Sequence, residues 1–162
     1  MKLIPLSGGN GVGKFAQVDD EDFEFLSGYS WWVQKGGHTF YAVSYIKNNF
    51  GYLQQTLMHR YILGVYDPKI FVDHENGDGL CNIRRNIRKC SHSQNMQNRR
   101  IGKNNTSGIT GVSWDKKRKK WRATIVLNNK KHHLGSFEHK KDAGSAYDTK
   151  AKELFGEFHR KQ

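Results

Sequence analysis

Short runs of alternating apolar and polar residues dominate the first part of the chain, and a period of two is typical of half-buried β-strands. Leu3–Leu6 and Phe15–Val18 flank a glycine-rich segment and therefore predict a β-hairpin. A short helix is predicted at Asp19–Gly28, because acidic residues fill its first turn and Phe23 and Leu26 face inward. Further strands are predicted at Tyr29–Val33, His38–Ile46 and Tyr52–Leu57.

The aromatic residues of these predicted strands are expected to form a compact core, to which Trp31, Trp32, Phe40 and Tyr41 contribute. A second short helix is predicted to begin at Met58-His59-Arg60 and to end before Pro68, since proline disfavours helical geometry in the residue before it. The first part of the chain thus predicts small antiparallel sheets with short helices between them.

The segment from Phe71 to Asn98 changes its pattern twice. An apolar step is followed by Asp73-His74 and by a turn over residues 75–79, whose Asn, Gly and Asp content favours tight-turn geometry. Apolar residues then recur at helical spacing, which predicts a helix over residues 83–90 with basic residues on its other positions. The apolar positions are Ile83, Ile87 and Cys90, and the basic ones include Arg84, Arg85 and Arg88.

Beyond residue 106 the pattern is again that of strands, followed by one helix. Strands are predicted at Ser107–Asp115, Trp121–Leu127 and Lys131–Phe137, with a tight turn at Asn128-Asn129. Apolar residues at helical spacing from Ala143 to Phe155 predict a helix that packs across the sheet. This part therefore predicts a three-stranded antiparallel sheet packed on one C-terminal helix, and the whole chain an α+β fold.

Charge is distributed unevenly along the 162 residues, whose formal net charge is +12. Residues 1–95 carry 10 Lys/Arg against 9 Asp/Glu, and residues 96–162 carry 17 against 6, so the net charges are +1 and +11. Such an asymmetry indicates a polyanionic partner, with nucleic acid before a membrane. No stretch approaches the roughly 18 apolar residues of a membrane span, so we expect a soluble, cytoplasmic protein. The pattern implies no protein partner.

Two other kinds of site are suggested by local motifs but are disfavoured. Residues 8–14 match the first seven positions of a phosphate-binding Walker A loop, yet Phe15 stands where Ser or Thr should bind magnesium, and a strand follows instead of a helix. A zinc cluster of Cys81, Cys90 and His92 is conceivable, but it has one ligand too few for a structural site. Neither an ATPase nor a zinc-binding protein is expected.

The segment VDHENGDGLCNIRRNIRKCSHSQNMQN, together with Met58-His59-Arg60, resembles the HNH nuclease motif, closest to the homing endonucleases of phages and introns. The resemblance implies a strand–strand–helix (ββα-metal) unit that binds one divalent metal, Mg²⁺ or Mn²⁺. It implies that His74 is the general base and that Asp73 and Asn95 are metal ligands. It also implies that Asn86 braces the loop that presents the histidine.

The chemistry of these residue types agrees with the resemblance. A carboxylate and an amide carbonyl are hard oxygen ligands suited to Mg²⁺. A neutral histidine accepts a proton near neutral pH. Supporting the site structurally and lining it are equally compatible roles for His59. The alternative is that Asp73-His74 merely caps a turn and that the Asn/Gln run from Gln94 to Asn98 is a solvated loop.

Residues 107–148, SGITGVSWDKKRKKWRATIVLNNKKHHLGSFEHKKDAGSAYD, resemble the plant Apetala-two/ethylene-response-factor DNA-binding domain. That resemblance implies a sheet that lies in the major groove of DNA. The matching positions are Gly111, Val112, Trp121, Ala123, Ile125, Leu134, Gly135, Phe137, Ala143, Ala146, Tyr147 and Asp148. Thr110, Ser113 and Asp115 stand where the plant domains usually have arginine, so the docking mode is carried over and the target sequence is not.

Together these patterns predict a metal-dependent DNA endonuclease that binds double-stranded DNA and nicks one strand. The expected domains are residues 1–98 with the nuclease motif at 58–98, a basic linker at 99–106, and a DNA-binding domain at 107–162. The alternative is a non-catalytic DNA-binding regulator with a structural HNH-like unit. The predicted DNA contacts are Arg84, Arg85, Arg88, Arg99, Arg100, Lys103, Trp114, Lys116, Arg118, Lys120, Arg122, Thr124, Lys130 and Lys131.

Overall fold

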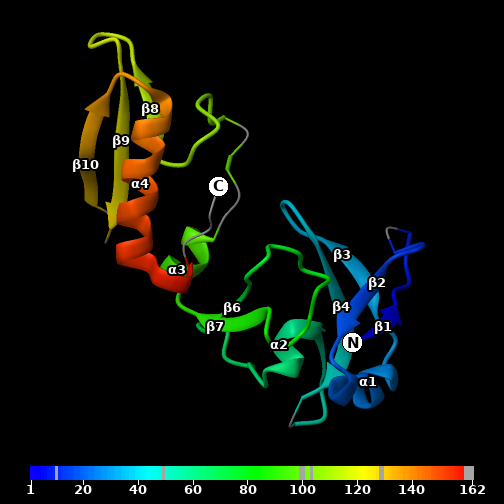
Figure 1. The fold of residues 1–162 in the computed structure, drawn as a ribbon. Coiled ribbons are helices and arrows are strands. Elements are labelled where there is room, and N and C mark those ends of the chain that lie inside the picture. Colours follow the sequence, from blue (N-terminus) through cyan, green and yellow to red (C-terminus); the bar gives the residue numbers. More distant parts are fainter. Residues whose placement is uncertain (10, 49, 99–100, 103, 128–129, 159–162) are drawn as a thin grey trace. The chain divides into compact units, whose positions relative to one another are not determined.

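The computed structural model describes residues 1–9, 11–48, 50–98, 101–102, 104–127 and 130–158. The chain divides into two compact units, Met1–Met96 and Gln97–Gln162. Both combine helices with small antiparallel sheets, which confirms the predicted α+β class (Figure 1). Among the described residues, no helix is long and apolar enough to cross a membrane.

The N-terminal unit begins with the predicted hairpin, in which β1 (Lys2–Pro5) pairs antiparallel with β2 (Phe15–Val18). Its glycine-rich loop closes through backbone hydrogen bonds such as Leu6 N to Lys14 O at 3.1 Å. A strand, and not a helix, follows this loop, so it lacks the geometry of a Walker A site. The predicted helix follows as α1 (Asp20–Ser27), with acidic residues in its first turn.

A second sheet has the order β3-β4-β5, from β3 (Trp32–Lys35), β4 (Phe40–Lys47) and β5 (Leu53–Leu57), and leads into α2 (Met58–Ile62). Trp31 is the largest fully buried side chain, and its indole Nε1 donates a hydrogen bond to the carbonyl of Leu26 at 2.8 Å. The core prediction is correct for Trp31, whereas Trp32, Phe40 and Tyr41 are only half-buried. This core supports the strands and helix that surround the candidate site.

The predicted helix over residues 83–90 is wrong, because residues 87–90 form a strand. β6 (Phe71–His74) pairs antiparallel with β7 (Ile87–Cys90), and the helix α3 (His92–Gln97) comes only afterwards. Ile83 belongs to the preceding turn, where its carbonyl accepts hydrogen bonds from Asn86 N and Ile87 N. The apolar spacing that suggested a helix is therefore shared between a turn and a strand.

The C-terminal unit contains the predicted three-stranded sheet and helix. The strands β8 (Val112–Asp115), β9 (Lys120–Leu127) and β10 (Lys130–Phe137) are antiparallel in the order β10-β9-β8. Helix α4 (Lys140–Phe155) runs along one face of this sheet and is followed by a short 3₁₀ turn, η1 (Gly156–Phe158) (Figure 1). The predicted turn at residues 128–129 lies outside the described residues.

Packing between sheet and helix explains the alternation along β9. Ala123 and Ile125 are buried and pack with the helix residues Ala143, Tyr147 and Ala151 in two apolar clusters. Gly111 precedes β8 with φ +71°, and a Cβ there would lie 2.3 Å from the Tyr147 ring. Only glycine therefore permits both the backbone conformation and the close approach of the helix.

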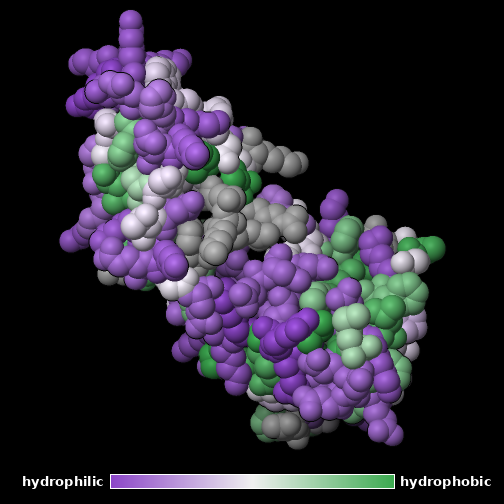
Figure 2. Space-filling view, viewed as in Figure 1, coloured by the Kyte–Doolittle hydropathy of each residue, from purple (hydrophilic) through white to green (hydrophobic). Residues whose placement is uncertain are grey.

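Surface polarity differs between the units. Figure 2 shows hydrophilic side chains over most of the visible face of the C-terminal unit, whereas apolar side chains gather around the β1–β2 hairpin of the N-terminal unit. Leu3, Val12 and Phe15 of that hairpin are 49%, 83% and 48% exposed. The polar, cation-rich exterior of the C-terminal unit is the kind of surface that binds a polyanion.

Candidate functional site

Asp73 and His74 end strand β6, and both are buried, with exposures of 7% and 5%. Asp73 lies opposite Arg88 in the register of β6 and β7. The guanidinium of Arg88 donates to Asp73 Oδ2 from Nη2 at 3.1 Å and from Nε at 3.3 Å. A buried carboxylate requires such a partner, and the neighbouring strand supplies it.

The ring of His74 is held by a residue that the sequence did not single out. His74 Nε2 lies 3.2 Å from Oδ1 of Asn82, which is fully buried. Burial lowers the pKa of His74, although the Asn82 hydrogen bond and the nearby carboxylates of Asp73 and Asp78 partly counteract this. His74 is therefore neutral at neutral pH and able to accept a proton.

Two further rings pack around His74. His59 of α2 lies edge-on to it with 4.7 Å between ring centroids, and Tyr41 of β4 lies 5.6 Å from His59 and 6.0 Å from His74. Burial, and then the proximity of His74 and Arg60, holds the pKa of His59 well below its usual value. Nδ1 of His59 is buried without a hydrogen-bond partner within the described part of the chain. His59 therefore lies directly against the candidate base, in a position compatible with its predicted supporting role.

Asn86 connects the turn after His74 with the segment at Cys81. Its Oδ1 accepts from Asn76 N at 3.0 Å, and its Nδ2 donates to the carbonyl of Cys81 at 2.7 Å. The backbone carbonyl of Asn86 also accepts from Glu75 N at 2.8 Å. Asn86 is thus placed as a brace for the loop, and its functional role stays a prediction. A cavity of about 470 Å³ opens beside it, lined by Glu75, Asn76, Cys81, Ile83, Arg85 and Asn86.

Asn95 lies half-buried in α3. The helix begins at a capping box in which Ser91 N donates to Gln94 Oε1 at 2.8 Å and Gln94 N donates to Ser91 Oγ at 3.2 Å. The ring of His92 packs against Phe71 of β6 with 5.2 Å between centroids. Residues three apart share one face of a helix, so Asn95 lies on the same face of α3 as His92.

The oxygen donors Asp73 and Asn95 fit a hard divalent cation better than zinc. Phe71 and Asp73 point to the same side of β6, because side chains alternate along a strand. Among the described residues, no group of three or more His, Cys, Asp and Glu side chains could hold a metal ion, so the zinc cluster of Cys81, Cys90 and His92 is not formed. The proposed pair of Asp73 and Asn95 includes only one residue of these four types, so it does not depend on a group of three.

The basic residues between the strands of the motif differ in their surroundings. Arg84 donates to Asp22 from Nε at 2.9 Å and from Nη2 at 2.6 Å, and its Nε lies 2.8 Å from Glu21. Its neighbour Arg85 is exposed, and within the described part of the chain it forms no ion pair. The contacts of Arg84, Arg85 and Arg88 with DNA stay predictions, and Arg84 and Arg88 already have acidic partners.

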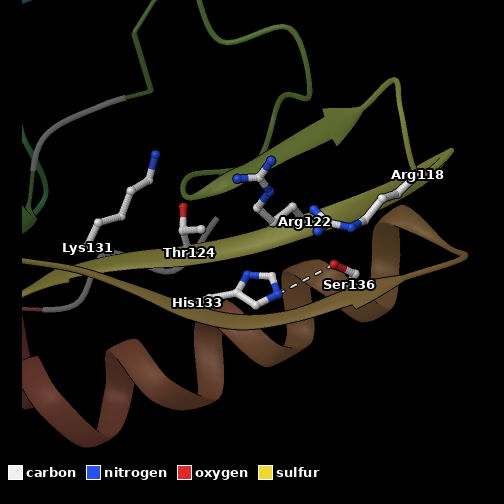
Figure 3. Close-up of a pocket in the computed structure, with 6 residues that line it drawn as sticks. All are labelled: Arg118, Arg122, Thr124, Lys131, His133 and Ser136. Atoms are coloured by element: carbon white, nitrogen blue, oxygen red, sulfur yellow. Dashed lines mark hydrogen bonds between the residues drawn. The ribbon is translucent and has the colours of Figure 1, made fainter.

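The exposed face of the C-terminal sheet, opposite α4, carries a cationic pocket of about 370 Å³. We call it the sheet-face pocket; it is lined by Arg118, Arg122, Thr124, Lys131, His133 and Ser136 (Figure 3). His133 and Ser136 were not predicted. The register explains their presence, because His133 pairs with Thr124 and Ser136 with Arg122, which places them on the same face. Ser136 Oγ lies 3.5 Å from His133 Nε2.

Asp115 organises the arginines of this pocket. Its Oδ2 lies 3.2 Å from Arg118 Nη1 and 3.1 Å from Arg122 Nη2, and its Oδ1 accepts from the backbone N of Lys117 and of Arg118 at 3.1 Å each. The backbone hydrogen bond from Arg118 and the two guanidinium groups hold the pKa of Asp115 at about 2. Asp115 stands where the plant domains usually have arginine. It instead fixes two arginines, Arg118 of the following turn and Arg122 of β9.

The remaining predicted contacts lie mostly at the surface. Trp114 is 44% exposed and packs against Trp121 with 5.1 Å between centroids. Lys116 and Lys130 are exposed, and Lys120 lies 3.9 Å from Glu138. Arg99, Arg100 and Lys103 of the predicted linker lie outside the described residues.

Comparison with known proteins finds two relatives. The uncharacterized HNH endonuclease L560 of Acanthamoeba polyphaga mimivirus is 31% identical over 155 residues, which span 93% of this chain and 75% of that protein. Protein 3.8 of Escherichia phage T7 is 34% identical over 90 residues, covering 56% of this chain and 74% of that protein. No protein-family model and no solved structure matches the chain.

Proposed function

Because the chain belongs to the HNH endonuclease family, we propose that it is a divalent-metal-dependent endonuclease that hydrolyses a phosphodiester bond of duplex DNA and nicks one strand. The N-terminal unit carries the chemistry, and the C-terminal unit supplies most of the affinity for DNA. The observation that carries this proposal is the buried, neutral His74 at the end of a strand, next to the carboxylate of Asp73.

In this reaction His74 acts as the general base. It accepts a proton from a water molecule whose oxygen attacks the phosphorus, a P–O bond to the new oxygen forms, and the bond to the leaving sugar oxygen breaks. Burial suits His74 for this role, because a lowered pKa keeps the imidazole unprotonated at neutral pH. Asn82 and His59 restrict the ring to one orientation, and restricted geometry favours attack.

Asp73 and Asn95 are the residues that would hold the metal. A bound Mg²⁺ or Mn²⁺ would stabilise negative charge on the phosphate and on the leaving oxygen. Arg88 neutralises Asp73 through its bond to Oδ2. A metal ion that binds Asp73 therefore has to displace this guanidinium or share the carboxylate with it. Asn86 keeps the turn that follows His74 in place through its bonds to Asn76 and Cys81.

Duplex DNA is the proposed partner of the C-terminal unit. Its sheet-face pocket contains two arginines, a lysine and a histidine around an open cavity, which suits phosphate oxygens. The resemblance to the plant DNA-binding domain supports the same face of the sheet as the contact surface. Lys116, in the turn after β8, extends this surface, whereas Trp114 pairs with Trp121 and lies on the other face of the sheet.

A supercoiled plasmid tests the activity. With Mg²⁺ or Mn²⁺ the purified protein should convert it to the nicked circle, and EDTA should stop the reaction until the metal is restored. Cleavage that persists in EDTA would contradict the metal-dependent mechanism.

The competing function, a non-catalytic DNA-binding regulator, is favoured by one observation, the ion pair that already engages Asp73 with Arg88. A protein that binds the plasmid tightly and never nicks it with either metal would support the regulator.

A further inference from the structure

We propose that Asn82 is a positioning residue that fixes which nitrogen of His74 carries its proton, and that the segment at residues 17–22 holds Asn82 in place for this role. This inference rests on the proposed function of His74 as the base. It gives a structural role to β2 and α1, which contribute no residue to the proposed chemistry.

The orientation of the Asn82 amide follows from its two side-chain hydrogen bonds. Nδ2 donates to the carbonyl of Leu80 at 3.2 Å, and a carbonyl can only accept, so this end of the amide is the NH₂ group. The other end, Oδ1, therefore faces His74 Nε2 at 3.2 Å. An amide oxygen accepts and never donates, so Nε2 of the neutral ring carries the proton. A neutral imidazole has only one N–H, and the basic lone pair consequently lies on Nδ1.

The backbone around Asn82 is tied to the N-terminal hairpin. Asn82 N donates to the carbonyl of Gln17 at 2.8 Å, and Gln17 N donates to the carbonyl of Leu80 at 2.8 Å. Gln17 belongs to β2, so this strand contacts the loop on both sides of Cys81. Both Asn82 and Leu80, the two residues that set the amide orientation, are thus bound to one residue of the hairpin.

A second attachment follows two residues later. Arg84 N donates to Asp19 Oδ2 at 2.7 Å, and the Arg84 side chain binds the buried Asp22. Residues 80–84 are therefore fixed to residues 17–22 at both ends. Because Asn82 is fully buried, it cannot touch DNA, and of the proposed site residues its side chain is hydrogen-bonded to His74.

Nuclear magnetic resonance of the wild-type protein tests the tautomer without any variant. Long-range ¹H–¹⁵N correlation spectra distinguish the protonated ring nitrogen of each histidine, and the His74→Gln variant assigns the signal. We expect the neutral His74 ring to be protonated at Nε2, with that proton protected from exchange. Protonation at Nδ1 overturns the proposal.

Variants of Asn82 connect this readout to turnover. Asn82→Ala should expose the Nε2 proton to rapid exchange and lower kcat by about 10–100-fold, by analogy with the loss seen when the partner of a metal-bound histidine is removed. KM for DNA should stay unchanged. Asn82→Asp retains an acceptor oxygen toward Nε2 and should restore protection of the proton, whereas kcat should stay lowered, because a buried carboxylate cannot donate to the Leu80 carbonyl and favours the protonated ring. Asp20→Asn, whose carboxylate binds only the exposed N-terminus in the described structure, is the matched control and should behave as wild type.

The outcomes separate this inference from the proposed function. If wild-type protein does not cleave DNA, the proposed function fails, while the ring-proton spectra still decide whether Asn82 holds His74. If Asn82→Ala does not fold, the wild-type spectrum and Asn82→Asp decide. An Asn82→Ala protein with wild-type proton protection and wild-type kcat overturns the inference.

Discussion

Replacing Arg84 by alanine is expected to destabilise the N-terminal unit strongly, because it leaves the carboxylate of Asp22 buried without its cation. Asp22 is 1% exposed and accepts two hydrogen bonds from Arg84, at 2.9 and 2.6 Å. Removing one partner of a buried ion pair destabilises a protein by about 3–5 kcal/mol. The Arg84 side chain is 44% exposed, so water compensates part of this loss, and we expect about 2–3 kcal/mol.

For a unit of this size, a loss of about 2–3 kcal/mol lowers the melting temperature by roughly 10–20 °C. Differential scanning calorimetry of the full chain measures the shift, and amide hydrogen exchange identifies which unit has melted. Arg85→Ala is the matched control, since it removes the same charge from the adjacent residue, which forms no ion pair in the described structure. Its free energy of unfolding should change by less than about 0.5 kcal/mol.

A double-mutant cycle with Asp22→Asn isolates the interaction. Because the two side chains are in direct contact, the coupling free energy should be about 2 kcal/mol. Equal stabilities of the Arg84→Ala and Arg85→Ala proteins, with no coupling to Asp22, would show that Arg84 is not a structural anchor. Weaker DNA binding without loss of stability would instead favour the phosphate contact predicted from the sequence.

Three further results are expected. The carboxyl carbon of Asp115, followed by NMR, should titrate at about pH 2. The ionised carboxylate stabilises the turn fully above the unfolded pKa of about 3.8, and this stabilisation is lost as the pH falls through about 2. A midpoint near 3.8 would refute the arginine contacts. In urea titrations the N-terminal unit should lose stability as the pH falls below about 6.5. The unfolded chain binds a proton there, whereas His59 resists protonation because it is buried against His74 and Tyr41 and lies near Arg60. An equal pH dependence in His59→Gln would exclude His59 as the cause. Replacing Lys116, Arg118 and Lys120 together by alanine should reduce the salt dependence of DNA binding by roughly two to three units of slope in fluorescence anisotropy, and an unchanged slope would remove this turn from the interface.

Much of the fold follows from local patterns. Strict alternation and turn residues predicted the β1–β2 hairpin, the β3–β5 sheet and the C-terminal sheet with its helix, because each of these elements joins neighbours in sequence. The helix predicted over residues 83–90 was wrong, since Ile83, Ile87 and Cys90 fit a helical period although the chain turns after Ile83. The local signal that could have placed the helix one segment later is the capping box of Ser91 and Gln94.

The candidate site was predictable only where its residues are adjacent in sequence. Asp73 and His74 could be singled out because they form a contiguous motif at the end of an apolar strand. Asn82 had no signal of its own, because its importance arises from a backbone contact with Gln17, far away in the chain. Likewise, the partners of Arg84 lie 62 to 65 residues earlier, and no periodicity links such distant positions.

Single-turnover cleavage of plasmid DNA by wild-type and His74→Ala proteins, at saturating protein and with Mg²⁺, tests the proposed chemistry most directly. If His74 takes the proton from the attacking water, the variant should cleave about 10²–10⁴-fold more slowly. Its affinity for DNA should remain nearly unchanged, because base catalysis contributes little to ground-state binding. Wild-type cleavage by a folded His74→Ala protein would contradict the assignment of His74 as the base.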